Sequence, residues 1–190
     1  MKLPSDAHFS RPWRIHELTR DFRLEDVWAL PTPGGPDDFP RLLSGMASFD
    51  AHRCSMVGIL FAIREALGAV FGWDRPGDDP TRPSLRQRLP ADLRGCPSTV
   101  QPTMGFTPLY QLDDEWAAEI INKTVHGVIH LGWVPDDGGG YRGQMAILVK
   151  PNGLLGHAYM AFITPFRYGI VYPQMLKRID RQWLSRTADR

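Results

Sequence analysis

Two histidines, His126 and His130, are the residues whose type and spacing most strongly suggest chemistry. On a helix, side chains four residues apart share a face and could bind one metal ion. The surrounding segment, Val125 to Val134, instead has the β-branched and aromatic content of a strand. On a strand the two residues lie about 13 Å apart, too far for a single ion. We therefore predict no metal site. The two imidazoles should share one face of a sheet, where they face solvent or line a cavity.

A charged residue, Arg167, lies within an apolar segment that runs from Leu154 to Tyr172. A buried charge is costly unless it is paired or reaches water. We expect Arg167 to reach a carboxylate such as Glu119 or to meet the anionic head group of a ligand. The aromatic and methionine side chains around Arg167 belong either to a core or to the wall of a pocket.

The other polar groups of the sequence have ordinary explanations. Asp50, His52 and Cys54 are typical of residues that cap or pack a helix terminus. Glu115 and Glu119 follow the turn residues Asp113 and Asp114, so we expect them to be solvated and not to form a catalytic pair. No catalytic residues are predicted, no cofactor is implied, and an enzyme is less expected than a binding protein.

Length and composition indicate a single domain. The chain has 190 residues, 43% of them hydrophobic, and a formal net charge of +1, which gives no electrostatic reason to expect nucleic acid as a partner. Its two cysteines are typical of a reduced, cytoplasmic protein. The longest uninterrupted apolar run is about 13 residues, shorter than the roughly 20 that a membrane-spanning helix needs. Oligomeric state stays open.

The pattern of the chain predicts an α+β domain. Residues 1–12 are expected to be flexible, Trp13 to Phe22 to form a first strand and Arg23 to Leu30 a short helix. A helical insertion over residues 38–94 follows, with its strongest run from Ser55 to Trp73. Alternating apolar residues and glycine-rich turns predict an antiparallel meander over residues 106–150. A long helix is expected over residues 154–186.

The predicted C-terminal helix should pack on the sheet because an antiparallel sheet with one apolar face must be covered. Pro165 and Pro173 each remove a backbone hydrogen bond, so we expect the helix to be kinked near one or both. Such a bend could shape a cavity, or it could let the helix follow a curved sheet.

Several short motifs along the chain resemble those of one protein family. They are Pro12-Trp13, Asp26 to Trp28, Leu109-Tyr110, Thr124 to Val128, Gly132 to Pro135, Lys150 to Gly156, Pro165 to Arg167 and Ile170 to Pro173. In these motifs the chain is similar to the bacterial family known as domain of unknown function 2867, and its order of elements resembles the helix-grip fold of the START-like and polyketide-cyclase-like (SRPBCC) superfamily. The resemblance implies a curved antiparallel sheet wrapped around a long C-terminal helix, with additional helices inserted after the first strand and a cavity between sheet and helix. It implies no activity.

The sequence thus predicts a protein that binds a small apolar or amphipathic ligand between its sheet and its C-terminal helix. One alternative is a cyclase or hydrolase that uses histidine, arginine and glutamate side chains of the cavity. Another is association with a membrane surface through an exposed Leu154 to Phe162 segment. The residues expected to contact the ligand are His126, His130, Trp133, Met145, Tyr159, Phe162, Phe166 and Arg167.

Overall fold

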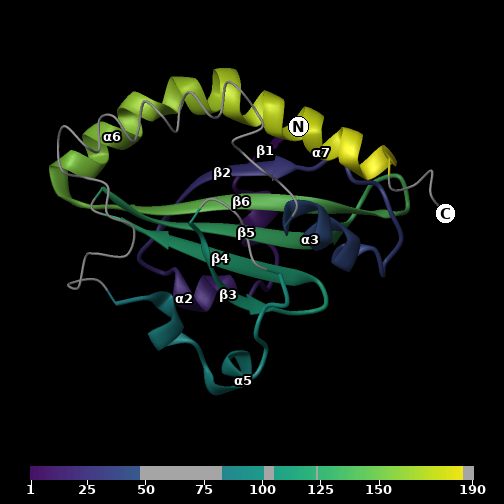
Figure 1. Ribbon diagram of the computed structural model, residues 1–190, viewed down its shortest axis with the longest axis horizontal. Coiled ribbons are helices and arrows are strands. Elements are labelled where there is room, and N and C mark those ends of the chain that lie inside the picture. Colours follow the sequence, from purple (N-terminus) through teal and green to yellow (C-terminus); the bar gives the residue numbers. More distant parts are fainter. Residues whose placement is uncertain (48–82, 101–104, 123, 186–190) are drawn as a thin grey trace.

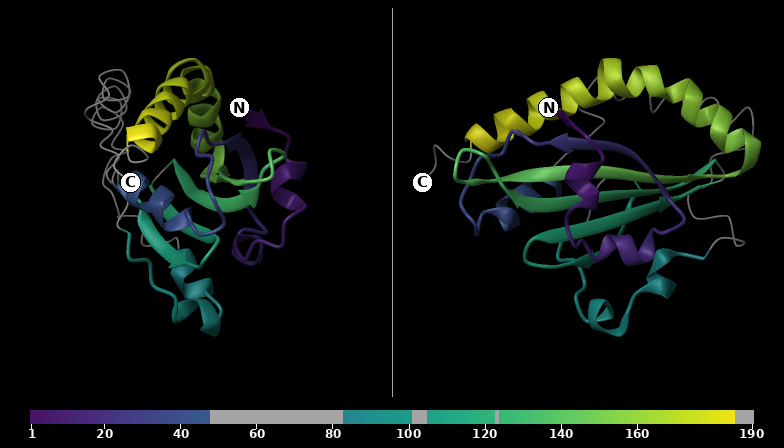
Figure 2. Two further views of the ribbon diagram at one scale, coloured as in Figure 1. Left: turned by 90° about the vertical axis from the view of Figure 1, so that its right-hand side faces the viewer. Right: turned by 180° about the vertical axis from the view of Figure 1, so that it is seen from behind.

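The computed structural model describes residues 1–47, 83–100, 105–122 and 124–185. Within them, a six-stranded antiparallel sheet with strand order β1-β2-β6-β5-β4-β3 forms the centre of the molecule. A long helical segment arches over one face of this sheet, and several short helices lie against the other face (Figures 1 and 2). The predicted α+β class with a long C-terminal helix is confirmed. The residues expected to form a helix from Ser55 to Trp73 lie outside the described part of the chain.

Two short strands and several short helices precede the meander along the described part of the chain. The strands are β1 (Lys2–Leu3), β2 (Arg23–Ala29), β3 (Thr107–Gln111), β4 (Glu115–Ile121), β5 (Val125–Pro135) and β6 (Tyr141–Pro151). The helices are α1 (Asp6–Phe9), α2 (Ile15–Leu18), α3 (Phe39–Ala47), the 3₁₀ helix η2 (Leu85–Arg88), α5 (Ala91–Arg94), α6 (Gly153–Phe166), the π-helix η3 (Arg167–Val171) and α7 (Tyr172–Ser185).

Strands β3 to β6 form the predicted meander, each pairing antiparallel with the next. The turn between β5 and β6 places Gly139 at a φ of 82°, a conformation that glycine adopts without steric cost. Because successive side chains of a strand point to opposite faces, Ile129, Leu131 and Trp133 face the C-terminal helices while His126 and His130 face the short helices.

Among the described residues, the two larger apolar cores lie on opposite faces of the sheet. The first, beneath α3 and α7, contains Leu30, Phe39, Leu42, Leu43, Trp116, Leu131, Trp133, Met145, Tyr172, Ile179 and Trp183. The second, beneath α2, η2 and α5, contains Trp13, Ile15, Leu18, Leu85, Leu89, Leu93, Leu109, Tyr110, Val128, Val134 and Leu148. The sheet is therefore covered on both sides, which explains why its strands carry few exposed residues.

The C-terminal helix changes its winding between the two prolines. Pro165 lies inside α6 and Pro173 is the second residue of α7, and the five residues between Phe166 and Tyr172 form the π-helical turn η3. Proline cannot donate the backbone hydrogen bond of a regular helix, and π-turns are a common way for a helix to bend. The interruption predicted from the prolines therefore takes the form of a π-turn near the top of the arch (Figure 1).

The N-terminal assignments were wrong in two places. The segment from Trp13 to Phe22 contains the helical turn α2 and no strand, and the expected helix from Arg23 to Leu30 is strand β2. A β-bulge between Leu24 and Asp26 shifts the register of β2 and breaks the alternation by which a strand is recognised. Residues 1–12, expected to be flexible, contain β1 and α1.

Candidate functional site

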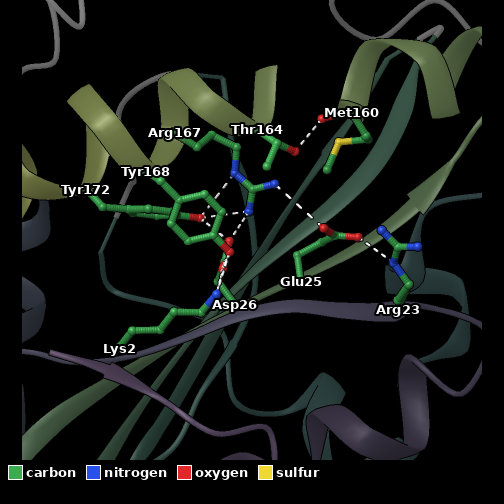
Figure 3. Close-up of polar contacts among 9 residues, drawn as sticks. All are labelled: Lys2, Arg23, Glu25, Asp26, Met160, Thr164, Arg167, Tyr168 and Tyr172. Atoms are coloured by element: carbon green, nitrogen blue, oxygen red, sulfur yellow. Dashed lines mark hydrogen bonds and ion pairs between the residues drawn. The ribbon is translucent and has the colours of Figure 1, made fainter. Parts of the chain in front are cut away.

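A buried aspartate links the sheet to the C-terminal helix. Asp26 follows the β-bulge of β2, and its side chain is 0% exposed. Its carboxylate accepts hydrogen bonds from the hydroxyl of Tyr172 at 2.6 Å, from the hydroxyl of Tyr168 and from the guanidinium of Arg167. The ammonium of Lys2 lies 3.4 Å from it (Figure 3). Four donors from β1, η3 and the first residue of α7 thus converge on one carboxylate.

A second carboxylate extends this group toward solvent. Glu25 lies 3.8 Å from Arg167 and 2.6 Å from the side chain of Arg23. Arg167 also donates to the hydroxyl of Tyr172 at 2.7 Å (Figure 3). We call Lys2, Glu25, Asp26, Arg167, Tyr168 and Tyr172 the Asp26 cluster.

The π-turn explains how η3 and the first residue of α7 present three donors to one acceptor. In a regular helix, residues 167 and 172 lie on different sides, because neighbours on one face are three or four positions apart. A π-turn joins residues five positions apart, which brings Arg167 and Tyr172 toward the same side. The local winding of the helix is therefore matched to the position of Asp26 on the sheet.

The electrostatics of the Asp26 cluster keep its donors in their donating forms. Burial raises the pKa of Tyr172 well above its usual value, and the bond to Asp26 adds to this effect. Burial and Asp26 also raise the pKa of Tyr168. Burial by itself would lower the pKa of Arg167, but Tyr172, Asp26 and Glu25 raise it above its usual value. Both tyrosines thus stay neutral, and the arginine stays charged.

Among the described residues, the packing under α6 is thin compared with that under α7. The buried contacts there form a small separate cluster of Val125, Val149 and Met160, against which Ile147, Tyr159 and Ile163 are only partly buried. On the outward side of α6, Leu154 is 91% exposed and Phe162 is 55% exposed. Helix α6 has no charged residue along its whole length, so much of its apolar surface is not covered by the described residues of the chain.

Both ends of α6 are nevertheless held firmly. At the start, Gly156 packs so closely that a Cβ atom there would lie 2.2 Å from the carbonyl oxygen of Thr124. At the end, Arg167 of the adjoining π-turn is bound to Asp26. The helix is therefore fixed at its two ends and loosely packed between them.

The predicted ligand-contacting residues fall into three places. Tyr159, Phe162, Phe166 and Arg167 lie on α6 and η3, with the rings of Phe162 and Phe166 5.6 Å apart. Trp133 and Met145 lie in the core beneath α3 and α7. His126 and His130 lie on the opposite face of the sheet.

Each of these two histidines is paired with a glutamate of the neighbouring strand. His126 Nε2 lies 2.8 Å from Glu119, and His130 Nε2 lies 3.1 Å from Glu115. All four side chains are buried. The prediction that the glutamates are solvated was wrong, because the turn beside them leads directly into a covered face of the sheet. Arg167 does reach a carboxylate, as predicted, but the partner is Asp26 and not Glu119, which lies on the opposite face of the sheet.

The two glutamates also hold the short helices in place. Glu115 accepts hydrogen bonds from the backbone N–H groups of Arg14 and Ile15 at 2.9 Å, where α2 begins. Glu119 accepts from the backbone N–H of Leu85 at 3.0 Å, where η2 begins. Each carboxylate therefore satisfies donors that a helix leaves free at its N-terminus.

These bonds shift the titration of both glutamates. Burial alone would raise the pKa of Glu115, but the bonds from His130, Tyr110 and the backbone of Arg14 hold it below its usual value. Burial would likewise raise the pKa of Glu119, and its bonds from His126 and from Ser84 hold that pKa down. Both carboxylates are therefore ionised near neutral pH.

The sequence did not predict that Asp26, Glu115 and Glu119 are buried carboxylates that join separate elements of the fold through their hydrogen bonds. The one signal for Asp26 was an acid beside the apolar pair Val27-Trp28.

Within the described ranges, no group of three or more His, Cys, Asp or Glu side chains is arranged to hold a metal ion. None of the helices in the described part is both long and apolar enough to cross a membrane. A small hollow of about 10 Å³ lies between α3 and α7, lined by residues that include Leu42, Met46 and Ile179.

The fold and the buried polar groups define an α+β protein whose sheet lies between a long C-terminal helix and a layer of short helices. The chain matches the model of the family described as protein of unknown function (DUF2867) over residues 18–174, so it belongs to that family. No curated protein and no solved structure matches the chain.

Proposed function

We propose that the chain is a cytoplasmic, bacterial helix-grip protein of the SRPBCC superfamily that binds a small, mainly apolar ligand between its sheet and helix α6. The observation that carries the proposal is the contrast along the C-terminal helix. Helix α7 buries Ile179 and Trp183 in the main core, whereas α6 buries the side chain of Met160 in a cluster of three residues. A helix that is apolar all round normally buries more of its surface than this.

The proposed ligand position follows from the way α6 is held. Because Gly156 and Arg167 fix its two ends, the segment between them can rise from β6 without detaching from the sheet. The half-buried side chains of Ile147, Tyr159 and Ile163 would then line the space from both sides. Contact with an apolar ligand stabilises a complex by about 25 cal/mol for each Å² removed from water.

The charges of the Asp26 cluster argue for a ligand that brings apolar surface and no negative charge to this position. Arg167 already lies against the carboxylates of Asp26 and Glu25. An additional anion would meet those two acids as well as the arginine. We therefore assign the Asp26 cluster the role of holding one end of α6 in position. The ligand would bind mainly through hydrophobic contact with the helix and the sheet.

An enzymatic role for the predicted polar residues has less support. A cyclase or hydrolase mechanism needs several acid and base groups in one pocket. His126, His130 and Glu119 lie on one face of the sheet, and Arg167 lies over the other. Each of these groups is engaged with a neighbour in a pair or cluster of its own.

Binding of the neutral fluorescent probe N-phenyl-1-naphthylamine tests the proposal. The wild-type protein should bind this apolar probe saturably with a stoichiometry near one. Ile163→Trp fills the space under α6 and should weaken binding by at least tenfold, which corresponds to about 1.4 kcal/mol. Phe162→Ser changes the outward side of the same helix and serves as the matched control, with binding within twofold of wild type.

The two variants also separate an internal site from an external one. If Phe162→Ser weakens the probe and Ile163→Trp does not, the apolar contact lies on the outer surface. That result would support the membrane-surface alternative, which flotation with phosphatidylcholine vesicles would then examine. Absence of saturable binding to the wild-type protein would contradict the proposal directly.

A further inference from the structure

A cluster of three histidines lies beneath the N-terminal segment, on the face of the sheet away from α6. The ring of His8, on α1, is 4.8 Å from the ring of His16 on α2 and 5.1 Å from that of His130 on β5. His8 and His130 are both 0% exposed. The cluster is outside the Asp26 cluster and has no part in the proposed ligand site.

Several ring nitrogens of this cluster have no hydrogen-bond partner among the described residues. Among the described residues, neither ring nitrogen of His8 has a hydrogen-bond partner, and the same holds for Nε2 of His16 and Nδ1 of His130. A buried polar atom without a partner costs free energy, and a buried unpaired charge costs much more. The close packing around His8, both of whose ring nitrogens lack a partner among the described residues, is therefore compatible with a neutral ring and strongly opposed to a protonated one.

The groups that face His8 do not compensate a positive charge on it. His16 of α2 and His130 of β5 are bases themselves, and β6 contributes the neutral amide of Gln144, which donates to the backbone oxygen of Ala7 at 3.2 Å. Glu115 of β4 is the nearby acid. Its carboxylate is already bound to His130, to Tyr110 and to two backbone N–H groups of α2; the Tyr110 hydroxyl on β3 is engaged in that bond.

The backbone pairing of the segment that carries His8 is confined to its first residues, where Met1 exchanges hydrogen bonds of 3.1 and 2.8 Å with Ala29. Strand β1 pairs with β2 over two residues, Lys2 with Trp28 and Leu3 with Val27. Helix α1 is a single turn. Elements of this size have low local stability, so a small change in free energy is enough to shift them between docked and released states.

We propose that residues 1–9 form a pH-sensitive strap, which protonation of His8 and His16 releases from the sheet. Release has consequences on both faces. It uncovers His130 and Glu115 on one face. On the other it removes Lys2, whose ammonium donates to Tyr168 at 2.7 Å and lies beside Asp26. Acidification therefore loosens the Asp26 cluster at the end of α6.

The change of the docking equilibrium with pH follows from the difference between the histidine pKa values in the docked and released states. Burial, with smaller contributions from His130 and His16, lowers the pKa of His8 from its usual 6.5 to about 3. Burial also lowers the pKa of His16. A lowered histidine pKa favours the docked state above pH 6.5, and that contribution is lost as the pH falls below 6.5. For His8 alone, the equilibrium shifts toward release by about thirtyfold between pH 7.5 and pH 5.

Hydrogen exchange measured by mass spectrometry tests the strap. After correction for the intrinsic pH dependence of exchange, protection of residues 1–9 should fall about thirtyfold between pH 7.5 and pH 5, while β5 and β6 stay protected. His8→Phe keeps an aromatic ring and removes the histidine with the larger pKa shift, so protection of its strap should depend on pH much less than in the wild-type protein. His157→Phe changes an exposed histidine of α6 and should behave as wild type.

Equal protection at both pH values in the wild-type protein would overturn the proposal. So would a pH-dependent loss in His8→Phe that matches the wild type. If His8→Phe does not fold, an NMR titration of the wild-type His8 ring decides the question. A ring that stays neutral while the strap is docked supports the strap, and a ring that titrates near 6.5 with the strap still docked contradicts it.

Discussion

Replacing Asp26 by asparagine removes one charge and little volume, and its effect can be worked out from the contacts. The side chain is 0% exposed and accepts from Tyr168, Tyr172 and Arg167. Removing one partner of a buried ion pair typically costs about 3–5 kcal/mol. Arg167 keeps Glu25 at 3.8 Å and is 12% exposed, which reduces the penalty. We expect Asp26→Asn to lower the free energy of unfolding by about 2–4 kcal/mol.

Urea denaturation followed by tryptophan fluorescence measures this change. With an m-value of about 2 kcal/mol/M, the midpoint should fall by about 1–2 M. A double-mutant cycle with Arg167→Met isolates the pair, and its coupling energy should be about 1–3 kcal/mol. Arg23→Gln is the matched control, because Arg23 is 69% exposed in its pair with Glu25 and exposed pairs contribute about 0–1 kcal/mol.

A change below about 0.5 kcal/mol for Asp26→Asn, the size of an ordinary surface substitution, would refute this reasoning. A coupling energy near zero in the cycle would do the same. Either result would mean that the contacts between Asp26 and η3 do not hold the C-terminal helix on the sheet.

Two further pairs of variants test the rest of the fold. Glu115→Gln and Glu119→Gln each weaken a cap on a short helix and should cost about 1–3 kcal/mol in urea denaturation. Both pKa values lie below 4.5 in the folded protein, so wild-type stability should fall as the pH drops below 4.5, and the variants should lose part of that dependence. Gly156→Ala places Cβ against the carbonyl of Thr124 and should lower the thermal unfolding temperature, at a cost of about 1–3 kcal/mol. Gly169→Ala meets open space and should stabilise the protein by about 0.5–1 kcal/mol; an equal effect of both alanines would contradict the close contact.

The sequence predicted the part of the fold that depends on local patterns. The segments that became β5 and β6 alternate clearly, and the glycines between them define the turn. Strand β2 was missed because its bulge breaks the alternation between Leu24 and Asp26. Helix α2 was read as a strand because Trp13, Ile15 and Phe22 favour strands. Its cap, Glu115, is 100 residues away from Ile15 in the chain.

The candidate site was predicted only in outline, for a similar reason. Arg167 was recognised as a charge that needs a partner, and the π-turn near it lies between the two prolines that predicted an interruption. Its partner Asp26 is 141 residues away, and no local pattern indicates that pairing. The strand pattern shows which residues share a face of the sheet, but it does not show which helices pack on that face. His126 and His130 were placed correctly on one face together, but their partners could not be predicted.

The account rests on a ligand site beneath α6, and native mass spectrometry of the protein purified from cells without detergent tests that site most directly. We predict a bound species of small-molecule mass that collisional activation releases, and that is greatly reduced in Ile163→Trp while Phe162→Ser retains it. A wild-type spectrum that contains only the mass of the bare chain, or an adduct that Ile163→Trp leaves unchanged, would contradict the account.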